Sequence, residues 1–83
     1  MTFEQIDQFL GAEIRAARAR RRMSHEELGA AVRLTKATVS RVENSQRSVK
    51  AEHLVCIGIA LGVPAAELLA IARQAHDAAE IHR

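Results

Sequence analysis

Lys36, Ala37 and Arg41 have the types and spacing expected of residues that contact the edges of DNA bases. Lysine and arginine donate hydrogen bonds to the O6 and N7 atoms of guanine, and a small alanine between them leaves room for a thymine methyl group. Thr38 lies at the edge of the same group. These four residues are candidates for base recognition if the chain presents them on one exposed face.

A helix over residues 36–44 would present them in this way. At about 100° per residue, Lys36, Ala37 and Arg41 share an arc of about 140° with two further polar residues, Ser40 and Asn44. Val39 and Val42 point to the far side of the helix. The segment therefore predicts a helix with one apolar face for the core and one free polar face.

A capping signal places a second short helix just before this one. Ser24 and Glu27 form a capping box, and the helix that it opens has Leu28, Ala31 and Val32 on its expected inner face. Two short helices, separated only by residues 33–35, predict a helix-turn-helix.

The starts of these two helices are also expected to bind phosphate. Thr35 is a good N-cap for the second helix. Unpaired backbone N–H groups and the positive end of each helix dipole make residues 24–26 and 35–37 natural anion sites. The motif over residues 25–44 has the geometry that lets a helix enter the major groove.

Three further helices complete an all-α prediction. The first would begin at a capping box of Thr2 and Gln5 and end near residue 22; the fourth would end at Gly62; the fifth would follow Pro64 and continue to about residue 81. The expected inward residues of the first and fourth helices are Ile6, Leu10, Ile14, Ala17, Leu54, Ile57 and Leu61, and the fifth helix contains Leu68, Leu69 and Ala72.

Composition and charge agree with one small helical domain that meets a polyanion. Hydrophobic residues form 48% of the 83 residues, but there is no Trp or Tyr, so the core is aliphatic. The net charge is only +2, yet residues 15–50 hold ten Lys or Arg against three Glu. A basic middle between acidic ends favours a nucleic acid that contacts one region, although a solvated helix face is an equally weighted alternative.

Three segments together resemble the Cro/repressor (XRE-type) helix-turn-helix family: residues 23–29 (MSHEELG), 34–44 (LTKATVSRVEN) and 60–64 (ALGVP). The resemblance covers residues 10–69, and its most specific part is the string from Thr38 to Asn44. It implies a compact five-helix, lambda-repressor-like bundle as a single domain over 1–83. It also implies a sequence-specific regulator of transcription, a repressor or autoregulator, that binds double-stranded DNA.

The resemblance assigns roles to residues at matching positions. Base contacts would come from Lys36, Ala37, Thr38 and Arg41. Phosphate contacts would come from Ser24, His25, Thr35, Ser40 and Asn44, with Arg47 as a further candidate. Arg18 would pair with Glu43 and tie the recognition helix to the first helix.

The sequence departs from the family pattern at three positions. His25 stands in place of the usual Gln, so a phosphate contact there would depend on pH. Arg33 replaces a Gly often found in the turn, where a positive φ would cost about 1 kcal/mol. Val49 replaces a common Pro after the third helix.

The C-terminal extension, residues 70–83, is expected to contribute to a homodimer. Leu68, Ala72, Ala75 and Ala79 recur at helical spacing and form a seam of small residues. The alternative is that this helix folds back on its own domain. A homodimer would bind a palindromic operator, with half-sites about 34 Å apart.

No enzyme, cofactor or metal site is expected, because acidic residues are scattered among caps and exposed positions. His76 and His82 are interpreted as surface residues, and Cys56 as a core residue in a reducing compartment. An acidic start without a membrane-spanning run indicates a cytoplasmic protein. The competing hypothesis is an antitoxin or anti-regulator module whose main role is to bind a partner protein.

Overall fold

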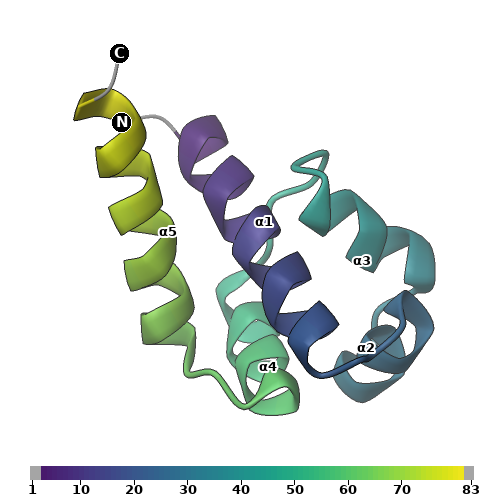
Figure 1. Cartoon of the computed structure of the whole chain (residues 1–83). Coiled ribbons are helices and arrows are strands. Elements are labelled where there is room, and N and C mark those ends of the chain that lie inside the picture. Colours follow the sequence, from purple (N-terminus) through teal and green to yellow (C-terminus); the bar gives the residue numbers. More distant parts are fainter. Residues whose placement is uncertain (1–2, 82–83) are drawn as a thin grey trace.

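A computed structural model describes residues 3–81, and the regular structure of this part is entirely α-helical (Figure 1). The five helices, in chain order, are α1 (Phe3–Arg20), α2 (His25–Val32), α3 (Lys36–Glu43), α4 (Ala51–Leu61) and α5 (Ala65–Ile81). The all-α, five-helix prediction is confirmed. The proposed capping box at Thr2 lies outside the described residues.

Local signals in the sequence explain where the helices begin and end. Ser24 caps α2 in a complete capping box with Glu27, and Thr35 caps α3 by accepting the backbone N–H of Thr38. Gly62 ends α4 in the left-handed conformation, with φ 72°. The first helix stops at Arg20, slightly earlier than expected, and Arg22 has a φ of 53°.

The core is aliphatic and draws on every helix. Ile14, Leu28, Ile57 and Leu68 are its largest fully buried side chains. The buried residues packed around them are Leu10, Ala17, Val32, Val39, Val42, Leu54, Leu61 and Ala72. In Figure 1, α5 runs beside α1, and α3 lies on the other side of α1. One end of the molecule thus carries α2 and α3 away from α5.

Three residues occupy environments that differ from the sequence expectation. Ala31 and Cys56 are exposed. Cys56 is therefore not a core thiol. His76 was expected at the surface but is 5% exposed. Its ring lies edge-on to Phe9, with ring centroids 6.0 Å apart, so the aromatic contact between α1 and α5 explains its burial.

Half of the expected dimer seam is also part of this core. Leu68 and Ala72 are both 0% exposed, because α5 packs its inner face against the rest of the chain. These two residues are not accessible to a partner, and the alternative that α5 folds back on its own domain is correct for them. Ala75 and Ala79 are exposed.

Among residues 3–81, no single helix is both long and apolar enough to cross a membrane; α4 and α5 reach that length and composition only as a pair bent by 100°.

Candidate nucleic-acid interface

The turn between α2 and α3 is short because two backbone features make it tight. Arg33 adopts the left-handed conformation, with φ 59° and ψ 40°, and the N–H of Leu34 donates to the carbonyl of Gly29 at 2.8 Å. Arg33 thus takes the conformation that the family usually gives to Gly, at a cost of about 1 kcal/mol. A Cβ on Gly29 would lie 2.4 Å from the oxygen of Leu34, so the turn packs directly on α2.

Helix α3 has the two faces that its sequence predicts. Val39 and Val42 are 3% and 5% exposed and anchor the helix to the core. The opposite face carries Lys36, Ala37, Arg41 and Asn44, all exposed, and the partly exposed Ser40. We call these five residues the α3 outer strip.

Thr38 does not belong to the α3 outer strip. It is 9% exposed, and its hydroxyl accepts a hydrogen bond from the Thr35 hydroxyl at 2.9 Å. Its backbone N–H also donates to Thr35 at 3.1 Å. Because Thr38 is turned toward the cap of its own helix, its expected base contact is not supported, and its observed role is to hold the start of α3.

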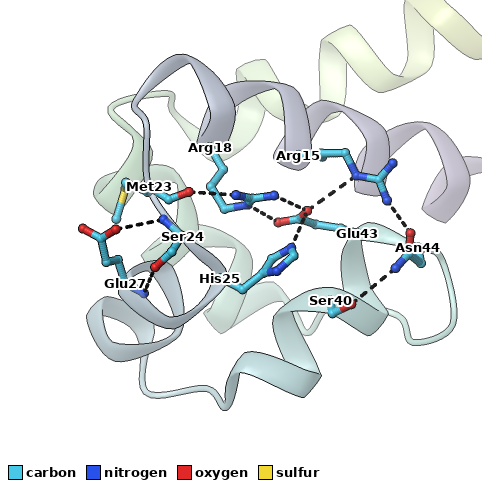
Figure 2. Close-up of polar contacts among 9 residues, drawn as sticks. All are labelled: Arg15, Arg18, Met23, Ser24, His25, Glu27, Ser40, Glu43 and Asn44. Carbon is cyan, nitrogen blue, oxygen red and sulfur yellow. Dashed lines mark hydrogen bonds and ion pairs between the residues drawn. The ribbon is translucent and has the colours of Figure 1, made fainter.

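Glu43, at the inner end of α3, forms an ion pair with Arg18 of α1. Arg18 donates from Nε to one carboxylate oxygen at 2.7 Å and from a terminal nitrogen to the other at 3.0 Å (Figure 2). A further Arg18 nitrogen donates to the carbonyl of Met23 at 2.7 Å. The bidentate pair thus fixes α3 to α1 and to the start of α2.

The pair also shifts the acidity of both groups. Burial by itself would raise the pKa of Glu43, but hydrogen bonds from Arg18 and His25 outweigh it and hold the pKa below its usual range. The hydrogen bond to Glu43 raises the pKa of Arg18. Glu43 is therefore an ionised carboxylate although its side chain is only 1% exposed.

Two more cationic or ionisable side chains converge on Glu43. The His25 Nε2 lies 3.1 Å from a Glu43 oxygen, and the Arg15 Nε lies 3.6 Å from the same oxygen. In Figure 2, Arg15 also reaches over to Asn44. Sequence reasoning missed Arg15, although it lies one helical turn before Arg18 on the same face of α1.

Of the other phosphate candidates, Ser24 and Thr35 are helix caps, and Arg47 is an exposed side chain. Ser24 accepts the N–H of Glu27 at 3.0 Å, and Thr35 caps α3, so both lie at helix starts. The N–H of Ser24 donates to Glu27, which lowers the pKa of that carboxylate. Arg47, beyond the end of α3, is exposed.

Lys36 and Arg41 remain accessible on the α3 outer strip. Lys36 lies 3.6 Å from Glu26 of α2, but both side chains are mostly exposed, so the pair is weak. Arg41 has an exposed side chain on the adjacent turn. These long cationic side chains can therefore reorient toward a ligand without breaking a buried contact.

A family model described as "Helix-turn-helix domain" matches residues 10–71, which is most of the chain. The chain belongs to the helix-turn-helix domain family. The matched range includes the α2, turn and α3 unit described above.

Two solved structures show the same fold. A crystal structure of the clp gene regulator ClgR from Corynebacterium glutamicum is 27% identical and covers 93% of this chain and 82% of that one, with a TM-score of 0.87. A second ClgR structure from C. glutamicum is 30% identical and covers 84% of this chain and 91% of that one, with a TM-score of 0.78. No curated protein sequence matches the chain.

Proposed function

We propose that this helix-turn-helix protein is a sequence-specific, double-stranded DNA-binding regulator of transcription, a repressor or autoregulator, that inserts α3 into the major groove as a homodimer. The observation that carries the proposal is the α3 outer strip, whose polar side chains lie at the surface while Val39 and Val42 fix the helix from behind. The similar ClgR structures are described as gene regulators, which supports the same class of function.

The strip has a chemistry suited to base edges. Arg41 and Lys36 donate to guanine O6 and N7, and Ala37 between them can pack on a thymine methyl group. The major groove is about 12 Å wide and accepts one helix. Around this helix, the starts of α2 and α3 and the free Arg47 contact phosphates, which fixes the position of α3 without reading sequence.

A second copy of the chain would use the exposed face of α4. Ile59 is 77% exposed and Val55 is 52% exposed. Ile59 borders two hollows, one of about 430 Å³ between α4 and the start of α5 and one of about 270 Å³ beside Ala31 of α2. A two-fold contact here would bury Ile59 and Val55 against the same face of the partner.

The lack of charged residues in this part of the chain also favours a second copy of the chain as the partner of the exposed α4 face. No charged residue occurs from Leu54 to Ala66. In a two-fold contact a patch meets its own copy, so a stretch of α4 without charged residues brings few like charges together. The resulting dimer would bind a palindromic operator with half-sites about 34 Å apart.

The test is a selection of bound sequences from random duplexes, followed by binding of two matched variants. Arg41→Ala is expected to reduce the preference for the selected base at one position in each half-site by about 1–3 kcal/mol, because it removes base contacts. Arg47→Ala is expected to weaken binding to selected and scrambled duplexes alike, because it removes a phosphate contact.

Two outcomes contradict this proposal. If Arg41→Ala leaves the base preference unchanged, α3 does not read the major groove. If the selection yields no consensus while the chain captures a partner protein through the same strip, the protein is a partner-binding antitoxin or anti-regulator module.

A further inference from the structure

Arg15 of α1 lies against the end of the α3 outer strip, 29 residues away from Asn44 in sequence. One of its terminal nitrogens donates a hydrogen bond to the amide oxygen of Asn44 (Figure 2). Arginine carries donors only, so this contact defines which end of the Asn44 amide faces α1. The oxygen faces Arg15, and the NH2 group faces Ser40, whose Oγ lies 3.4 Å from Nδ2.

This orientation matters for an anion. An amide that turned its oxygen toward a phosphate would repel it, whereas the NH2 group donates to it. Arg15 holds the oxygen back and leaves the NH2 group on the strip, beside Ser40. The amide is therefore set for phosphate binding before any DNA arrives.

Arg15 also brings an unbalanced positive charge to this point. Glu43 is already satisfied by Arg18, which donates two hydrogen bonds to it at 2.7 and 3.0 Å. Arg15 approaches the same carboxylate only to 3.6 Å, and its side chain is 52% exposed. One carboxylate thus faces two arginines, so the cluster keeps a surplus of positive charge at the surface.

We infer that Arg15 and Asn44 form a single phosphate-binding unit, in which Arg15 positions the Asn44 amide and adds its own charge to the contact with one DNA backbone phosphate. The inference rests on the proposed function and extends it to α1. It places a backbone contact at the C-terminal end of α3, opposite the contacts expected at the N-terminal end.

Binding is to be measured on the selected operator and on a scrambled duplex over a range of salt concentrations. Arg15→Gln is expected to weaken binding to both duplexes about eightfold at 0.1 M salt. The negative slope of log affinity against log salt should become shallower by about one, as the loss of one neutralised phosphate predicts. Arg15→Lys keeps the charge and should keep the slope. Arg73→Gln is the matched control, because it removes an exposed arginine from α5.

A double-mutant cycle tests whether the two residues act together. Asn44→Ala should weaken binding on its own but cost little more in an Arg15→Gln background. Circular dichroism melts of each variant show that the fold persists. A slope that does not change in Arg15→Gln, a change of the same size in Arg73→Gln, or fully additive costs would overturn the inference.

Binding by the wild-type protein distinguishes failure of the Arg15 inference from failure of the proposed function. Preference for the selected operator together with an unaltered slope in Arg15→Gln overturns the Arg15 inference alone. A wild-type chain that binds neither duplex overturns both.

Discussion

Glu43 is a charged residue buried at the junction of three helices, and it remains there because cationic partners surround it. Arg18 alone supplies two hydrogen bonds, so little of the carboxylate is left unsatisfied. A buried ion pair adds little stability compared with an apolar contact, but it specifies geometry. Here it fixes the angle of α3 relative to α1.

The lowered pKa of Glu43 gives a pH-dependent contribution to stability. The carboxylate stabilises the folded state fully above its unfolded pKa of about 4.3, and this contribution is lost as pH falls through the lower folded-state pKa. Glu43→Gln is expected to lower the free energy of unfolding at pH 7 by about 2 kcal/mol, since it removes hydrogen bonds to a charged group.

Urea unfolding of wild type and Glu43→Gln from pH 7 to pH 2 measures this effect. The difference between the two proteins should shrink as pH falls below about 5. Glu67→Gln removes an exposed carboxylate from α5 and serves as the control. A difference that stays constant with pH would contradict the assignment to ionised Glu43.

At the scale of elements, the helix-turn-helix depends on how closely the turn approaches α2. A Cβ on Gly29 would meet the backbone oxygen of Leu34 at 2.4 Å and its carbonyl carbon at 3.4 Å. Because the obstacle is backbone, it cannot be relieved by a side-chain rotation. The position of α3 relative to α2 therefore requires a residue without a side chain at 29.

Gly29→Ala should have two opposing effects on the free energy of unfolding. In an exposed helix, replacing glycine by alanine stabilises by about 1 kcal/mol, but here overpacking should destabilise by about 1–3 kcal/mol. We expect a lower free energy of unfolding in denaturant titrations. A Gly29→Ala protein as stable as wild type, or more stable, would show that the turn is not tightly packed on α2.

At the scale of the whole molecule, the proposed dimer face is separate from the α3 outer strip. Ile59→Asp places a charge in a stretch of α4 that has no charged residue, so we expect the chain to sediment as a monomer and to bind the operator with reduced affinity. Ala79→Asp is the matched variant at an exposed position of α5 and should leave the dimer intact. If Ala79→Asp dissociates the dimer and Ile59→Asp does not, the C-terminal extension is the interface instead.

The sequence by itself determined the helices and the two faces of α3. Caps act within three or four residues, so Ser24, Thr35 and Gly62 marked boundaries that the structure has. The helical spacing of apolar residues within α3 likewise identified Val39 and Val42 as buried. Such signals are local, so they can be recognised in the sequence without knowledge of the tertiary structure.

Only the tertiary structure decided the surroundings of particular residues, because these depend on how the helices dock. In α4 periodicity correctly predicted Leu54, Ile57 and Leu61 as inward residues, but the apolar neighbours of Cys56 suggested a core position that the structure does not give it. The burial of His76 depends on Phe9, far away in sequence. The convergence of Arg15 on Asn44 likewise depends on the packing of α1 beside α3, because contacts between distant residues are set by how helices dock and not by local spacing.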